Sequence, residues 1–136
     1  FTPQRKLGTV QDILEFKKQQ VVLADPNDSL QSIISQMATL GISQMPMTVG
    51  QGGLRMIEEL DILRAVAGGE YSLEDVARDI ARPLEGQVEP SQTLDQIQQI
   101  FEENNVAIVV EDGQVVGVVN KIDLLEYYTQ KNREAA

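Results

Sequence analysis

The sequence contains neither cysteine nor histidine among its 136 residues. Without cysteine the chain can form no disulfide and carries no thiol nucleophile. Without histidine it lacks the commonest general acid–base group and the commonest protein ligand of transition metals. A Ser-His-Asp triad and a zinc site built from His or Cys are therefore excluded, and we expect this chain to be non-catalytic and to hold no metal.

Aromatic residues and positive charge are also scarce. Aromatics make up 4% of the chain, and 21 acidic residues against 11 basic ones give a net charge of −10. A chain of this kind repels nucleic acid and anionic lipid and offers few rings on which bases could stack. No apolar run approaches the roughly 20 residues that cross a bilayer, and no secretory signal pattern is present. We therefore expect no nucleic-acid or membrane partner and a cytoplasmic location.

An internal repeat of about 60 residues organises the chain. Pro26 and Leu30 correspond to Pro90 and Leu94, and in both places a turn leads into a helix cap. Each half then shows a helix, two short apolar strands around a turn, and a second helix. The expected ranges are helix 30–40, strands 45–49 and 54–57 around a turn at 50–53, and helix 60–67, then helix 94–101, strands 107–110 and 115–119 around Asp112-Gly113, and a helix from 121.

Two further segments flank these repeats. The stretch from Thr9 to Phe16 predicts a short helix, and Ser72, followed by Asp75 three residues later, predicts a helix that opens between the halves. Since each repeat leaves one apolar sheet face open, two repeats related by a pseudo-two-fold axis would bury these faces against each other. The predicted class is α/β (α+β) with two β-α-β-β-α repeats. The predicted division is linker and short helix 1–20, first repeat 21–70, connecting helix and linker 71–84, second repeat 85–130 and tail 131–136.

Asp61 and Asp123 stand at matching positions, each between an apolar strand and a helix. A carboxylate at the start of a helix commonly caps exposed N–H groups and complements the helix dipole. A carboxylate can also accept two hydrogen bonds from a vicinal diol, as it does for the ribose in dinucleotide-binding folds. Repetition of the residue at both junctions favours a ribose-binding role, with helix capping as the alternative.

The closing stretch GVVNKIDLLEYY, residues 117–128, together with the repeat, resembles a CBS domain pair, also called a Bateman module. Such modules bind adenosine-containing ligands in clefts between the repeats. The usual pattern of the family is Thr, two variable residues and Asp. This sequence has Asn120 before Asp123 and Glu58 before Asp61, so both repeats depart from Thr. Glu58 would repel the phosphate of a nucleotide. The pair Glu58 and Asp61 therefore ranks as the second candidate site, after the site with Asp123.

Three segments are similar to the C-terminal regulatory region of bacterial cystathionine β-synthases, namely residues 41–47, 60–69 and 121–125. Because the chain begins at Phe1, we expect it to be part of a longer protein. The resemblance implies an attached N-terminal catalytic domain, a pyridoxal-phosphate enzyme that condenses serine or a related amino acid with homocysteine. It further implies an adenosyl effector, S-adenosylmethionine, and a ligand site formed by Gln20, Val21, Val22, Ile42, Ser43, Gln44, Met45, Val118, Val119, Asn120, Ile122 and Asp123.

The cations expected near this site bear on the choice of effector. Lys121 is the one basic residue inside the motif, which favours a sulfonium ligand without phosphate over a triphosphate. The resemblance also implies a homodimer formed through helices that carry Leu63, Val66, Leu124, Leu125 and Tyr128, with packing inside the chain as the alternative role of these residues. Two alternatives remain at this point: a structural or dimerising module that binds no ligand, and an AMP- or ATP-sensing CBS pair of another protein.

Overall fold

The computed structural model describes residues 8–18, 20–51 and 53–135. The chain forms two compact units. The first-repeat unit spans residues 22–84, and the second-repeat unit combines residues 85–136 with residues 1–21. The turn residue Gly52, the ends of the predicted linker and tail, and residue 19 lie outside the described residues. The segment that precedes the first repeat in sequence therefore belongs to the unit of the second repeat.

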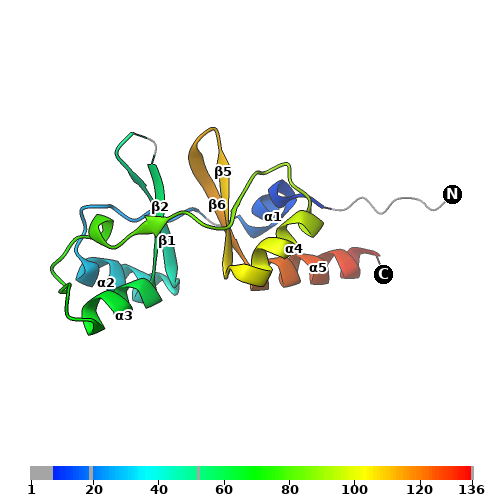
Figure 1. Cartoon of the computed structure of the whole chain (residues 1–136). Helices are drawn as coiled ribbons and strands as arrows, with labels where there is room; N and C mark the ends of the chain where they lie inside the picture. Colours follow the sequence, from blue (N-terminus) through cyan, green and yellow to red (C-terminus); the bar gives the residue numbers. More distant parts are fainter. Residues whose placement is uncertain (1–7, 19, 52, 136) are drawn as a thin grey trace. The chain divides into compact units, whose positions relative to one another are not determined.

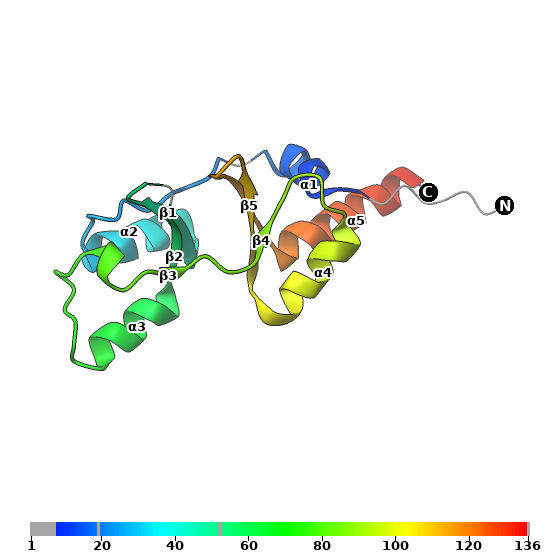
Figure 2. The same ribbon diagram turned by 45° about the horizontal axis from the view of Figure 1, so that its top comes forward.

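The first-repeat unit contains two α-helices, a short 3-10 helix and a three-stranded antiparallel sheet of order β1-β2-β3 (Figures 1 and 2). The Ser29 side chain caps the first helix by accepting from the Ser32 N–H at 3.1 Å, and Gly41 ends it in the left-handed conformation with φ of 68°. Local capping residues thus fix both ends of this helix. The elements are α2 (Leu30–Leu40), β1 (Gln44–Val49), β2 (Gly53–Glu58), α3 (Glu59–Ala67), the 3-10 helix η1 (Ala77–Asp79) and β3 (Arg82–Pro83).

The second-repeat unit has a sheet of order β4-β5-β6, in which β4 runs parallel and β6 antiparallel to β5 (Figure 2). Asp112 and Gly113 join β5 to β6 at the turn that the sequence predicts, and their positive φ values of 52° and 76° are those of a type I′ turn. The elements are α1 (Val10–Lys17), β4 (Gln87–Val88), α4 (Leu94–Glu103), β5 (Val106–Glu111), β6 (Gln114–Asn120) and α5 (Lys121–Ala135). The α+β class and the order of the main helices and hairpins are confirmed.

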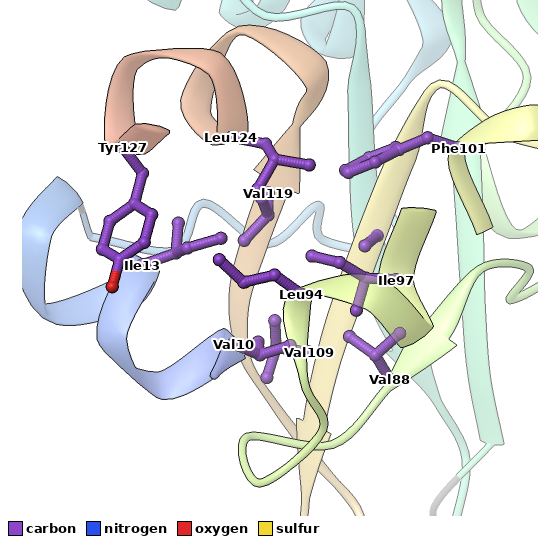
Figure 3. Packing of buried hydrophobic residues seen from close by; sticks show 11 residues of the cluster. Val10, Ile13, Val88, Leu94, Ile97, Phe101, Val109, Val119, Leu124 and Tyr127 are labelled. Carbon is purple, nitrogen blue, oxygen red and sulfur yellow. The ribbon is translucent and has the colours of Figure 1, made fainter. Parts of the chain in front are cut away.

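Helix α1 supplies part of the core of the second-repeat unit. Val10 and Ile13 are fully buried and pack with residues of α4, α5 and the sheet (Figure 3). Gly117 lets this helix approach β6 closely, because a Cβ at that position would lie 2.3 Å from Leu14 Cδ2. Burying such side chains stabilises the fold by about 1.5–3 kcal/mol each. The short helix predicted near Thr9 is therefore confirmed, and it is an integral part of the unit.

The segment before β3 occupies the same place in the first-repeat unit. Ala77 N–H donates to Asp28 O at 2.8 Å and Arg78 N–H donates to Pro26 O at 2.9 Å. In the second-repeat unit, Val10 N–H donates to Gln92 O and Gln11 N–H donates to Pro90 O, both at 2.9 Å. The repeat therefore extends to the two connecting segments, each of which is bonded to the turn that precedes a repeat's first helix.

The prediction of a helix opening at Ser72 is wrong. The segment is a turn followed by the three-residue helix η1. The carbonyls of Leu73 and Asp75 accept hydrogen bonds from Gln31 N–H at 3.0 Å and Leu30 N–H at 2.8 Å. These two carbonyls satisfy N–H groups at the start of α2, which lack partners inside their own helix. Because these carbonyls accept hydrogen bonds from α2, they are not available for the hydrogen bonds of an α-helix that starts at Ser72.

The strand expected at the start of the first repeat is absent from its described residues. Ala24 N–H donates to Pro46 O at 2.8 Å, but proline has no N–H with which to return a bond. In the second-repeat unit Ile108 stands at the position of Pro46, and its N–H donates to Gly86 O at 2.8 Å. This difference of one donor explains why β4 forms a strand and its counterpart does not.

Candidate functional site: two carboxylate half-sites

Asp123 lies in the first turn of α5 and caps it. Its Oδ2 accepts the Asn120 N–H at 2.8 Å, and Asn120 Oδ1 in turn accepts the Asp123 N–H at 2.8 Å. This reciprocal pair is a capping box, in which Asn takes the place of the usual Ser or Thr. The capping role considered for Asp123 from the sequence is therefore present in the structure.

Lys17 is a second partner of Asp123. Its Nζ lies 2.7 Å from Asp123 Oδ2 and donates to Val118 O at 2.5 Å. The Lys17 and Asp123 side chains are only 15% and 13% exposed. Helix α1 thus ends with its last-turn cation placed on the carboxylate that opens α5 and on the carbonyl of the preceding strand. Asp123, Asn120, Val118 and Lys17 together form what we call the Asp123 half-site.

The first-repeat unit repeats this arrangement with different residues. Asp61 Oδ2 accepts the Glu58 N–H at 2.8 Å, and Arg82 Nε donates to both carboxylate oxygens of Asp61 at 3.2 Å. Arg82 Nη2 also forms an ion pair with Glu58 Oε1. The three side chains are half-buried, and we call them the Asp61 half-site. Each repeat therefore places one cation from its connecting segment on the carboxylate at the helix start.

These two cations correct the expectation that the site is poor in basic residues. Lys17 is separated from Asp123 by 106 positions and Arg82 from Asp61 by 21, so no local motif reveals either contact. The Asp123 half-site holds Lys17 against a single carboxylate, with exposed Lys121 beside it in sequence. The Asp61 half-site holds one arginine against two carboxylates. The ion pair of the Asp123 half-site is therefore balanced in charge, whereas the Asp61 half-site has more negative than positive charge.

The remaining predicted ligand residues fall into two groups. Gln20, Val21 and residues 118–123 belong to the second-repeat unit, while Val22 and residues 42–45 belong to the first-repeat unit. Gln20, Ser43 and Ile122 are exposed, whereas Val21, Val22, Ile42, Gln44 and Val118 are half-buried. Met45 and Val119 are fully buried in the hydrophobic cores of their units, which leaves mainly their backbone groups for a ligand.

Within the first-repeat unit, the start of β1 adjoins the Asp61 half-site. Gln44 pairs with Glu58 in the antiparallel register, and Ser43 O accepts the Glu59 N–H at 3.0 Å. The Ser43 hydroxyl donates to Gln44 Oε1 at 2.7 Å. The structure thus brings the predicted residues Ser43 and Gln44 beside the carboxylate of the same repeat. The sequence motif placed these residues in another site with Asp123.

A separate hollow of about 540 Å³ lies in the second-repeat unit. It contains none of the predicted ligand residues. It lies near Thr9 and the Asp112 turn, at the ends of α1 and β6 opposite Lys17 and Asn120. Among the described residues, no cluster of three or more acidic side chains is arranged to hold a metal ion. The lining residues are Thr9, Gln11, Glu89, Pro90, Ser91, Val110, Glu111 and Asp112.

Comparisons with known proteins match part of this chain to a domain family. Residues 77–130 match the CBS domain family. No curated protein matches the chain. A CBS-domain containing protein from Agrobacterium tumefaciens is 22% identical, with a TM-score of 0.76 over 93% of this chain and 98% of that one.

Across the described part of the chain, no helix is long and apolar enough to span a bilayer.

Two further solved structures share the fold. CBSX2, solved in complex with AMP, is 16% identical, with a TM-score of 0.72 over 92% of this chain and 98% of that one. A hexameric CBS-CP12 protein from bloom-forming cyanobacteria is also 16% identical, with a TM-score of 0.73 over 89% of this chain and 68% of that one. The chain therefore has the fold of CBS-domain proteins over most of its length, and the predicted CBS resemblance is confirmed at the level of the domain.

Proposed function

We propose that this chain is a regulatory, non-catalytic CBS domain pair that binds an adenosine-containing effector through Asp123, and in a second site through Asp61. The observation that carries the proposal is the repeated half-site: a half-buried carboxylate at a helix start, beside a strand end and a basic side chain. Carboxylate oxygens accept hydrogen bonds from the ribose diol, and each unit has half-buried apolar side chains that suit a flat base, Val21 and Val118 in the second-repeat unit and Val22 and Ile42 in the first-repeat unit. CBSX2 bound to AMP supports this class of ligand.

The two half-sites differ in charge and should therefore prefer different adenosyl ligands. In the Asp123 half-site, Lys17 balances the single carboxylate, so a phosphate meets no excess of negative charge there, and this favours an effector with a phosphate, such as AMP. At the Asp61 half-site, Arg82 faces both Glu58 and Asp61, and the excess negative charge favours S-adenosylmethionine, whose sulfonium is positive. Opposite charges attract more strongly in a partly desolvated site than in water.

We further propose that the effector controls an attached catalytic domain of the cystathionine β-synthase type. Support comes from the similarity of residues 41–47, 60–69 and 121–125 to the regulatory region of those enzymes. A ligand shifts such a control equilibrium only by its different affinity for the two states. The assignment would be supported if the longer protein had a pyridoxal-phosphate-dependent activity and this activity changed when the effector was added. Activity that ignores every adenosyl compound would contradict it.

A homodimer is the oligomeric state that we propose. Leu63 on α3 and Leu125 on α5 hold matching repeat positions and are 64% and 58% exposed. Leu60 and Ile122 repeat the same correspondence one turn earlier, at 47% and 58% exposed. Exposed apolar stripes of this kind mark interaction surfaces. The CBS-CP12 protein, which shares this fold and is hexameric, supports the proposal that the chain self-associates.

The test is thermal unfolding of the chain with AMP, S-adenosylmethionine and ATP in turn, repeated on Asp123→Ala. A ligand at a hundred times its dissociation constant adds roughly 2.7 kcal/mol, which raises the melting temperature by several degrees. We expect AMP to give the largest shift and Asp123→Ala to lose it. Because this variant also loses a helix cap, the quantity compared is the shift caused by ligand, with exposed Asp95→Ala in the first turn of α4 as control.

A purely structural module is the second candidate, favoured by the occupied state of both carboxylates. Asp123 and Asp61 each already cap a helix and form an ion pair, so each carboxylate has a structural role without a ligand. Under this candidate, no adenosyl compound shifts the melting temperature of the wild-type chain. A shift that survives in Asp123→Ala and in Asp61→Ala would contradict the proposed sites while leaving ligand binding in place.

A further inference from the structure

The two oxygens of Asp123 are unequally used. Oδ2 accepts from both the Asn120 N–H at 2.8 Å and Lys17 Nζ at 2.7 Å. Oδ1 has no hydrogen-bond partner among residues 8–18, 20–51 and 53–135. A carboxylate oxygen has two lone pairs, so two donors fill the capacity of Oδ2. One side of the carboxylate is thus saturated by the protein itself.

A ribose diol presents two neighbouring hydroxyls, and bidentate binding uses both carboxylate oxygens. The hydroxyl that reaches Oδ2 must therefore replace a donor already there. The Asn120 N–H is fixed, because it belongs to the backbone turn that opens α5. The Lys17 ammonium ends a flexible side chain and keeps a second acceptor in Val118 O. Of the two donors, Lys17 is the one that can give way.

An ammonium that loses its carboxylate needs another anion. The Lys17 side chain is 15% exposed, so water replaces the lost partner poorly. Helix α1 stays docked through Ile13, which is fully buried, and Leu14, which contacts Gly117. The ammonium therefore remains beside the half-site when it is displaced. A ligand phosphate would restore its charge partner, whereas a nucleoside without phosphate would not.

We infer that Lys17 is a specificity-determining residue of the Asp123 half-site, where it yields its place on the carboxylate to the ribose and selects phosphate-bearing adenosyl ligands over adenosine. The inference rests on the proposed function, because it takes Asp123 as the ribose acceptor. Lys17 thereby weakens the binding of a nucleoside and strengthens the binding of a nucleotide. The same exchange links ligand binding to the last turn of α1.

Isothermal titration of AMP and of adenosine into the wild type, Lys17→Met and Lys18→Met tests this inference. Lysine 18 is the exposed neighbour, so Lys18→Met removes the same charge without an ion pair to Asp123. We expect Lys17→Met to bind adenosine about three- to tenfold more tightly and to reduce the preference for AMP over adenosine about tenfold. Lys18→Met should preserve the wild-type preference.

Lys17→Arg provides the second variant, since it keeps a cation and should retain most of the preference for AMP. Circular dichroism verifies that each variant is folded. An unchanged preference in Lys17→Met, with binding still lost in Asp123→Ala, would overturn the role of Lys17 and leave the proposed function intact. Absence of binding in the wild type, or full binding in Asp123→Ala, would overturn the proposed function and this inference with it.

Discussion

At the scale of single residues, the carboxylates at the helix starts combine structural and chemical roles. Asp123 caps α5 and holds Lys17, while Asp61 holds Arg82 and accepts the Glu58 N–H. A capping interaction contributes about 0.5–2 kcal/mol, so either residue has a structural reason to be present. Each carboxylate also holds a cation from a distant segment, and the proposed ligand sites rest on the recurrence of this arrangement in both repeats.

Tyr127 gives a prediction about alkaline stability. Its side chain on α5 is buried in the core together with Val10 and Ile13 of α1. Burial, followed by the nearby Asp12 carboxylate, raises the Tyr127 pKa above the usual 10.0, against a smaller lowering effect of Lys131. The unfolded tyrosine therefore ionises first as pH rises. The stabilisation is complete below pH 10 and is lost as pH climbs through the raised pKa of the folded state.

Urea unfolding of the wild type and Tyr127→Phe from pH 8 to 11 measures this effect. We expect the free energy of unfolding to fall less steeply above about pH 10 in the variant, because the ionisable group is gone. Tyr128→Phe serves as comparison, since burial also raises the Tyr128 pKa but this ring is 39% exposed. Equal slopes in the wild type and Tyr127→Phe would show that Tyr127 does not govern alkaline unfolding.

At the scale of elements, the docking of α1 on β6 depends on a glycine. An alanine Cβ at Gly117 would lie 2.3 Å from Leu14 Cδ2, far inside contact distance. We expect Gly117→Ala to lower the free energy of unfolding by about 1–3 kcal/mol, the usual cost of overpacking. Because α1 carries Lys17, the variant should also weaken the link between this helix and Asp123.

A double-mutant cycle with Leu14→Ala separates the clash from other effects of the substitution. Chemical denaturation of the two single variants and the double variant supplies the four free energies. Removing the Leu14 branch makes room for the new methyl group, so Gly117→Ala should cost less in the Leu14→Ala background than in the wild type. Additive costs would mean that the two residues do not meet, contrary to the packing described.

The sequence was sufficient to predict elements whose ends are set locally. Ser29 and Gly41 mark α2, and Asp112-Gly113 marks the β5–β6 turn, because capping and left-handed φ values need only neighbouring residues. The segment after Ser72 has the same local signature as a helix start, yet its carbonyls are taken by the N–H groups of α2. Local patterns do not encode such long-range competition for acceptors.

The candidate site likewise has one part that the sequence predicts and one part that it does not. The position of Asp61 and Asp123 at helix starts follows from the repeat, and the structure has both there. Lys17 and Arg82 were missed because their partners lie 106 and 21 positions away. Their only sequence signal was that each stands at the end of a connecting segment that the repeat pattern treats as a linker. Because of this omission, Lys17 was missing from the comparison of charges that favoured S-adenosylmethionine at the Asp123 half-site.

At the scale of the whole molecule, two similar units each contribute an exposed apolar stripe, and the proposed homodimer uses these stripes. We expect sedimentation equilibrium to give a dimer for the wild type and a monomer for Leu63→Glu combined with Leu125→Glu, since buried charges disfavour an apolar contact. Leu40→Glu is the control, because Leu40 is 50% exposed but lies on α2. A wild-type monomer at the highest accessible concentration would contradict the proposed dimer.

The central claim is that a carboxylate at a helix start receives the ribose of an adenosyl ligand. The backbone amide of Asn120 reports on this most directly, because its N–H donates to Asp123 Oδ2 at 2.8 Å. We expect AMP to shift the ¹H–¹⁵N resonance of this amide in a saturable manner, with the fitted dissociation constant matching that from calorimetry. Saturable binding of AMP that leaves the Asn120 and Glu58 amides unchanged, or no binding at all, would contradict the account.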